Sequence, residues 1–111
     1  MIPGIYLIGF SAYGNRIGEG LVVIKDGSVN GGDPSYLYRG HFDSYGEDVK
    51  GNIEVRHYRG PLNSVLGPLK QFNLILSGKV SGDNFQVSGN IPNMPNATIN
   101  ITGTKIADLF D

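Results

Sequence analysis

The sequence predicts an all-β protein, a single domain in which short antiparallel strands close into a small barrel. Seventeen glycines and six prolines recur along the 111 residues. They leave apolar stretches of roughly five to ten residues, too short for ordinary helices. Several stretches alternate apolar and polar residues with a period of two, as half-buried strands do. Eight such strands would expose two sheet edges if the sheet stayed flat, and closure removes both edges.

Each strand is justified by its composition and by the turns beside it. Stretch 4–11 is apolar, and because no basic leader precedes it, we expect a strand rather than a secretion signal. Asp26-Gly27 tolerates positive φ at both central positions of a tight hairpin, so it joins two neighbouring strands. In chain order, the eight expected strands are 4–11, 18–25, 28–30, 35–42, 49–57, 69–77, 85–91 and 97–103.

Alternation is clearest in three of the later stretches, where apolar or small residues share one face. Those faces are Val49, Gly51, Ile53 and Val55; then Phe85, Val87, Gly89 and Ile91; then Ala97, Ile99, Ile101 and Gly103. Breaks rich in turn-forming residues are expected at 13–15, 31–34, 44–46, 60–68, 81–84 and 92–96. Because the connections are short, an up-and-down barrel is favoured, while a sandwich with similar local patterns stays open.

Several glycines are expected to point into the barrel, because a strand that bends sharply needs positions without a Cβ atom. The candidates are Gly18, Gly20, Gly40, Gly51, Gly89 and Gly103. A closed eight-stranded barrel holds side chains and at most a small ligand. We therefore expect aromatic side chains to fill most of the interior.

Composition excludes several classes of function. The formal net charge is −1, and the nine Lys and Arg residues are scattered from Arg16 to Lys105, so no extended positive surface for nucleic acid is expected. The absence of Cys excludes disulfides, thiolate catalysis and sulfur-ligated zinc, and is compatible with a reducing cytosol. No apolar run approaches the roughly 20 residues that cross a bilayer, so membrane integration is not expected.

Neither an enzyme nor a bound metal or cofactor is expected from the residues present. His41 and His57 are the only imidazoles, and neither has a carboxylate and a hydroxyl at a recognisable spacing. The basic and aromatic residues of 56–59 are too few for a single-strand nucleic-acid site and are expected to end a strand. Asp33 is expected to cap backbone NH groups of its turn rather than to contact a ligand.

Two stretches of the chain are rich in glycine: Gly18-Glu-Gly-Leu-Val-Val-Ile-Lys-Asp-Gly27, and Gly31-Gly32-Asp33 followed by Tyr36-Leu-Tyr38-Arg-Gly40. Both stretches resemble the GrlR-like family of small bacterial proteins. The opening Gly4-Ile5-Tyr6 and the later Ser64-Val65-Leu66-Gly67 are similar to the family as well. The resemblance implies a lipocalin-like, calycin-type eight-stranded barrel. It also implies a cytoplasmic, dimeric negative regulator of type III secretion genes that binds and restrains a transcription activator.

The resemblance also points to a partner-binding segment. The family's regulator carries the acidic run Glu-Asp-Glu-Asp in an exposed loop, and the matching residues here are Ser44, Tyr45, Gly46, Glu47 and Asp48. Only the last two keep the acidic character, so the same helix-turn-helix activator is not assured as partner. An ordinary solvated turn is the competing interpretation, because loop tips are usually polar.

The alternative function is a lipocalin-like carrier or sensor that binds an apolar small molecule inside the barrel. The residues expected near that ligand are Tyr6, Tyr36, Tyr38, Phe42, Phe72 and Phe85. The tail 106–111 carries Ile106, Leu109 and Phe110 at helical spacing, which suits packing on a barrel mouth or a second subunit, or fraying.

Overall fold

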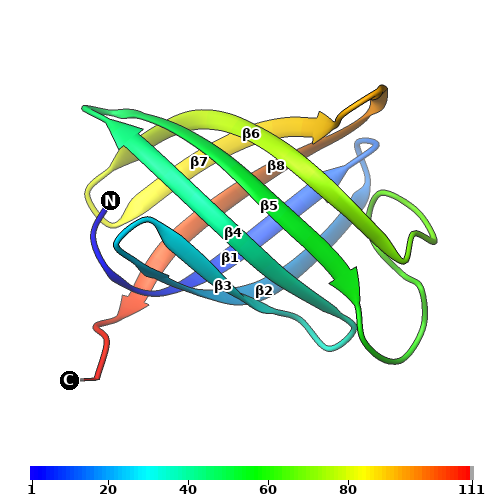
Figure 1. Ribbon diagram of the computed structural model, residues 1–111, viewed down its shortest axis with the longest axis horizontal. Coiled ribbons are helices and arrows are strands. Elements are labelled where there is room, and N and C mark those ends of the chain that lie inside the picture. Colours follow the sequence, from blue (N-terminus) through cyan, green and yellow to red (C-terminus); the bar gives the residue numbers. More distant parts are fainter. Residues whose placement is uncertain (111) are drawn as a thin grey trace.

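A computed structural model describes residues 1–110 and contains eight antiparallel strands in one closed barrel (Figure 1). Each strand pairs with the next, and the last pairs with the first to close the sheet. The strands are β1 (Gly4–Ala12), β2 (Arg16–Lys25), β3 (Ser28–Gly32), β4 (Tyr36–Tyr45), β5 (Asp48–His57), β6 (Gln71–Ser81), β7 (Asn84–Ile91) and β8 (Met94–Ala107). The predicted barrel of eight strands is confirmed, and the sandwich is excluded.

The turns follow the local chemistry of the chain. Asp26 and Gly27 have φ angles of 51° and 84°, the positive values that a two-residue hairpin between twisted strands requires. The Asp33 carboxylate accepts hydrogen bonds from the backbone NH groups of Ser35 and Tyr36 at 2.8 and 2.7 Å. Both the predicted hairpin and the predicted capping role of Asp33 are therefore confirmed.

Some strands extend further than the residue pattern predicts. The predicted breaks that prove too long are 31–34, 44–46, 81–84 and 92–96. The largest difference is in β8, which begins at Met94 and pairs with both β7 and β1. Similarly, β4 runs to Tyr45 before its two-residue turn. Hydrogen bonding to a neighbouring strand keeps these residues extended even where apolar and polar side chains do not alternate.

The C-terminal tail forms no helix within the described residues. β8 continues through Ile106 to Ala107, because its last residues pair with the start of β1. Leu109 is half-buried, whereas Phe110 is fully exposed. The helical spacing of Ile106, Leu109 and Phe110 therefore does not correspond to a helix, because Ile106 belongs to a strand, and Asp111 lies outside the described residues.

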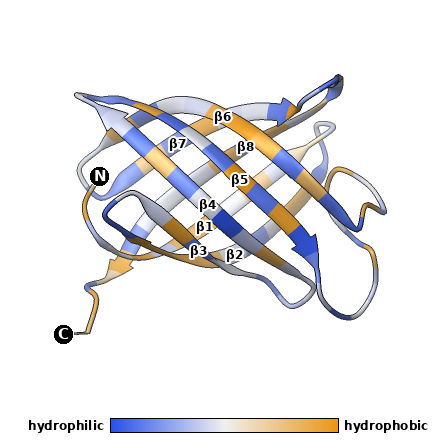
Figure 2. Cartoon of the chain, in the orientation of Figure 1, coloured by the Kyte–Doolittle hydropathy of each residue, from blue (hydrophilic) through white to orange (hydrophobic). Residues whose placement is uncertain are grey.

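The core consists of the inward side chains of alternate residues. In β5, for example, Val49, Ile53 and Val55 are buried, while the residues between them face outward or lack a side chain. Figure 2 shows this alternation of apolar and polar residues along the strands. The predicted inward glycines lie on the same face of their strands as the buried core residues.

Some of these glycines make room for aromatic rings. Three of them lie opposite an aromatic residue of the neighbouring strand, and a Cβ atom there would come within 2.0–2.4 Å of the ring. The pairs are Gly18 with Phe10, Gly51 with Phe42, and Gly103 with Phe85. A side chain at any of these glycines would displace a ring from its place in the core.

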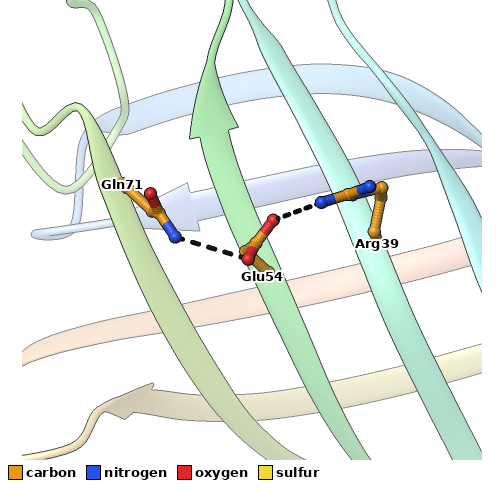
Figure 3. A network of polar contacts seen from close by, with 3 residues as sticks. All are labelled: Arg39, Glu54 and Gln71. Atoms are coloured by element: carbon orange, nitrogen blue, oxygen red, sulfur yellow. Dashed lines mark hydrogen bonds and ion pairs between the residues drawn. The ribbon is translucent and has the colours of Figure 1, made fainter.

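The outer surface of β4, β5 and β6 is mostly polar, with Ile75 of β6 as an exposed apolar residue. Glu54 of β5 accepts a hydrogen bond from Arg39 of β4 at 2.9 Å and another from Gln71 of β6 at 3.3 Å (Figure 3). Exposed ion pairs of this kind contribute about 1 kcal/mol or less to stability. This side of the barrel is therefore a solvated surface.

Different segments cover the two ends of the barrel. At the end that we call the hairpin end, two-residue turns join β2 to β3, β4 to β5 and β6 to β7, and both chain termini lie nearby (Figure 1). Met1 packs against the core there, and its amino group donates to Ser44 Oγ at 3.1 Å. At the opposite loop end, residues 58–70 fold over the barrel with Val65 and Leu66 buried.

Candidate functional site

The barrel contains a cavity of about 250 Å³ toward its loop end. Its walls are mostly aliphatic and aromatic side chains, including Phe42, Leu76 and Phe85 from three strands and Val65 from the covering loop. Protein interiors normally contain few voids larger than a water molecule. The expectation that aromatic side chains fill the interior is therefore wrong over this volume, and the cavity is a candidate binding site.

The cavity reaches the surface beside the first half of β2. Because β3 is only five residues long, it pairs with residues 21–25 of β2 and leaves 16–20 without a partner on that side among the described strands. Ile17 and Glu19, both exposed, line the cavity together with the inward Gly18. This gap between strands is a lateral mouth in the barrel wall.

Asp33 places a carboxylate at the rim of this mouth. One carboxylate oxygen, Oδ1, accepts the two backbone hydrogen bonds that cap the turn after β3. The other, Oδ2, accepts a hydrogen bond from the Tyr38 hydroxyl, which the sequence pattern did not predict. The carboxylate is half-buried and lines the cavity. Within residues 1–110, no ion pair involves it.

Tyr38 is a hydrogen-bond donor in the cavity wall and stays protonated at physiological pH. Burial raises its pKa most, and the hydrogen bond to Asp33 raises it further, because an ionised phenol would face a carboxylate. Its side chain is only 7 % exposed. The Phe10 ring packs edge-on against it, with the ring centroids 6.1 Å apart.

The loop of residues 58–70 is attached to the same wall through Tyr36. The Tyr36 hydroxyl donates to the Leu69 carbonyl at 2.7 Å and accepts from the Ser64 NH at 3.3 Å. These bonds keep Val65 over the cavity. Sequence reasoning predicted only a break in this region, because contacts to a distant tyrosine leave no local pattern.

The six aromatic residues expected near a ligand are all buried inside the barrel. Those that line the cavity are Tyr36, Tyr38, Phe42, Phe72 and Phe85. Tyr6 is buried but lies outside the cavity lining, with its ring centroid 5.7 Å from that of Phe85. Contact of these residues with a ligand stays a prediction.

The segment expected to bind a partner lies at the hairpin end of the barrel. Ser44 and Tyr45 end β4, Gly46 and Glu47 form the turn, and Asp48 begins β5. Gly46 has a φ of 62°, so the turn requires a residue that tolerates the left-handed region. The segment is thus a tight hairpin rather than an extended loop.

The side chains of this segment differ in their exposure and in whether they form an ion pair. The Tyr45 side chain is 72 % exposed, and Glu47 is exposed as well. Asp48 instead forms an ion pair with Lys79 of β6. The hydrogen bond with the Lys79 ammonium lowers the pKa of Asp48, and the same bond raises the pKa of Lys79. Asp48 is therefore ionised beside a cation of the neighbouring strand, whereas Glu47 forms no ion pair within residues 1–110.

Comparison with known families covers nearly the whole chain. A family model described as the type III secretion system (T3SS) negative regulator, GrlR, matches residues 1–109. The chain belongs to the GrlR family. The resemblance noted in the glycine-rich stretches is thereby confirmed, and the matched region includes every strand of the barrel. No curated protein matches the chain.

The two histidines of this GrlR-family chain have separate surroundings. His41 Nε2 lies 3.6 Å from Asp43 Oδ2 on the outside of β4. His57 Nε2 lies 2.8 Å from the carbonyl oxygen of Gly60. In the described part of the chain, no three His, Cys, Asp or Glu side chains form a group that suits a metal ion. Nor does that part contain a helical membrane span.

The side chains of Tyr58 and Arg59 attach the loop of residues 58–70 to the turn after β3. β5 ends at His57, as expected from the sequence. The Tyr58 hydroxyl donates to the Asp33 carbonyl at 2.7 Å, and Arg59 Nε donates to the Pro34 carbonyl at 2.9 Å. These side chains are thus used in contacts within the GrlR-family barrel.

Proposed function

We propose that this protein is a non-enzymatic, cytoplasmic negative regulator of type III secretion genes that acts by binding a helix-turn-helix transcription activator. The observation that carries the proposal is the GrlR family match over residues 1–109. A binding role also suits a chain whose two histidines stand apart and whose exposed features are turns and strand surfaces.

The acidic character of the hairpin end supports a contact with a basic partner. The carboxylates in or near its turns are Asp26, Asp43, Glu47, Asp48, Asp83 and Asp108. The cations of the same end are Lys25, Lys50, Lys79, Lys105 and the Met1 amino group, one fewer than the carboxylates. Helices that bind DNA carry Lys and Arg for phosphate contacts, so such a helix is electrostatically complementary to this end.

Within this end, Tyr45 and Glu47 are the groups best placed to contact the activator. An exposed tyrosine offers a large contact area, and tyrosines are enriched among residues that dominate binding energy. Glu47 takes no part in the ion pairs of the described chain, whereas Asp48 is paired with Lys79. The proposed contact therefore depends more on Glu47 than on Asp48.

The test measures the affinity of the purified protein for a purified transcription activator of type III secretion genes from the same bacterium. Glu47→Lys and Tyr45→Ala are each expected to weaken binding about tenfold or more. Asp83→Lys makes the same charge change on the neighbouring turn and is the matched control, with an expected loss below about threefold.

Repression of a secretion-gene reporter should fall in parallel with affinity. Wild-type protein that does not bind the activator would refute the proposed partner. Unchanged affinity in both Glu47→Lys and Tyr45→Ala would refute the turn as the contact.

The outer surface of β1 and β2 supports a homodimer. Leu7 lies opposite Leu21, and Ile5 lies opposite Val23. Ile5 is half-buried, and the other three are 40–48 % exposed. Contiguous apolar patches on small proteins commonly mark interfaces, and a two-fold axis lets such a patch cover its own copy. Leu21→Glu should convert the dimer to a monomer in sedimentation equilibrium; a wild type that is monomeric at every concentration contradicts this.

The cavity favours a second function, that of a small lipocalin-like carrier or sensor for an apolar molecule. Its volume of about 250 Å³ and its aromatic and aliphatic lining suit a small apolar ligand. Native mass spectrometry should then detect a small molecule bound in one-to-one ratio, either co-purified or added. Unliganded protein in every sample counts against the carrier.

A further inference from the structure

The volume of the cavity limits the size of a ligand. An apolar cavity of about 150 Å³ accommodates one benzene molecule. In proportion, the cavity of about 250 Å³ in this barrel accommodates an apolar body of roughly ten heavy atoms. A chain of roughly eight carbons or a bicyclic ring is of this size, whereas a long-chain lipid is much larger.

The charge of the cavity lining limits the head group of that ligand. Among the lining residues the charged side chains are Glu19 and Asp33, and both are acidic. Neither has a cationic partner among residues 1–110. An anionic head group would meet two like charges at the mouth, whereas a cation would be attracted by both.

Two arginines lie near the mouth, and each makes a contact within the chain. The Arg16 guanidinium lies over the Tyr13 ring, with its Cζ atom 5.5 Å from the ring centroid. Arg59 donates to the Pro34 carbonyl at 2.9 Å. Neither arginine is among the residues that line the cavity. A ligand carboxylate would therefore find no basic side chain in the wall.

Asp33 is oriented to accept a hydrogen bond from a ligand. Two NH donors hold its Oδ1, and the Tyr38 hydroxyl holds its Oδ2. Each carboxylate oxygen accepts up to two hydrogen bonds, so Oδ2 can accept one more. A bond between an ammonium and a carboxylate is about twice as strong as a neutral one, and here the acceptor needs no rearrangement.

We infer that the cavity binds a small amphiphilic amine, with the ammonium group at Asp33 and an apolar body of roughly eight to ten carbons inside the barrel. This inference rests on the carrier or sensor function proposed above and adds the class of ligand to it. It does not depend on the activator contact at the hairpin end.

Three probes with the same apolar chain and different head groups test the inference: n-octylamine, n-octanol and sodium n-octanoate. Isothermal titration calorimetry of the wild-type protein near neutral pH is expected to rank them in that order. The amine should bind about tenfold or more tighter than the carboxylate, because only the amine gains a charge-assisted bond at Asp33.

The substitution Asp33→Asn tests whether the tighter binding of n-octylamine depends on Asp33. It keeps the Oδ1 acceptor and the shape of the side chain but removes the charge. Affinity for n-octylamine should fall about tenfold, and affinity for n-octanol should change less than about twofold. Asp26→Asn is the matched control, because it removes one carboxylate at the hairpin end and Asn tolerates the positive φ there. All probe affinities should stay unchanged in that control.

The possible results distinguish an error in the proposed amine head group from an error in the proposed carrier function. If n-octanoate binds as tightly as n-octylamine, the amine class is wrong and the carrier function stands. If none of the three probes binds, both fail. If Asp33→Asn folds but keeps the wild-type ranking, the ammonium does not lie at Asp33. Should Asp33→Asn not fold, the wild-type ranking alone still decides the amine class.

Discussion

The interior of the barrel is hollow from the loop end as far as Val29, Phe42 and Phe85, and it is packed beyond them at the hairpin end. Tyr6, Ile24 and Val49 lie toward the hairpin end, are almost completely buried and do not line the cavity. Two-residue turns hold the strands together there. At the loop end, β3 stops early and residues 58–70 cover the opening instead. The short β3 therefore leaves the cavity open at its side, and the loop of residues 58–70 covers its end.

This difference separates the two proposed roles in space. The proposed ligand site is at the loop end, beside Asp33, and the proposed activator contact is at the hairpin end, around Tyr45 and Glu47. Variants at one end should leave the other role intact, so each role can be tested alone.

The largest expected difference is in the cost of shortening a core side chain. Ile24→Ala should lower the free energy of unfolding by about 2–5 kcal/mol, because it opens a new void in packed surroundings. Ile53 lines the existing cavity and has fewer contacts to lose, so Ile53→Ala should cost about 1 kcal/mol less. Urea denaturation measures both values. An equal or larger loss at Ile53 would contradict the packing difference.

Enlarging a side chain should act in opposite directions in the two halves. Val49→Ile adds a methylene where the core is full and should cost about 1–3 kcal/mol. Val55→Ile adds the same group beside the cavity and should stabilise the fold by about 0.5 kcal/mol or more. Urea denaturation measures the free energy of unfolding of both variants. If both substitutions raise it, or both lower it, the two halves are packed alike.

The hydroxyl in the cavity wall should make the protein sensitive to alkaline pH. Because the pKa of Tyr38 is raised in the folded state, its contribution to stability is complete below about pH 10, the pKa of an unfolded tyrosine. Above that pH the unfolded chain loses the proton first, and stability should fall by about 1.4 kcal/mol per pH unit.

Tyr38→Phe should reduce this alkaline slope, measured by denaturation at a series of pH values from about 8 to about 11. The pKa of Tyr6 is also raised by burial, so Tyr6→Phe provides the comparison from the packed half. An unchanged slope in Tyr38→Phe would mean that its hydroxyl ionises normally.

The smallest expected effect is on the outer surface, which belongs to neither end. Glu54→Ala removes both hydrogen bonds of the Arg39, Glu54 and Gln71 network on β4, β5 and β6. Because these groups are solvated, the free energy of unfolding should change by about 0.5 kcal/mol or less. A loss above about 2 kcal/mol would show that this network is part of what holds the barrel closed.

Local chemistry accounts for the parts of the fold that could be predicted from the residues alone. Alternation in 49–55 places Val49, Ile53 and Val55 on one face because successive residues of a strand point to opposite sides. The hairpin at Asp26-Gly27 and the cap at Asp33 were predictable for the same reason, since each depends on neighbours a few residues away. The resemblance to the GrlR family was also visible in the glycine-rich stretches.

Closure of the sheet explains the features of the candidate site that no local sequence pattern predicts. The lateral mouth exists because β3 pairs with only half of β2, and the loop of residues 58–70 covers the cavity because it hydrogen-bonds to Tyr36 from about 30 positions away. The bond between Asp33 and Tyr38 belongs to a site only because both line the hollow half. These features depend on which distant residues the closed barrel brings into contact, and alternation along a strand carries no information about that.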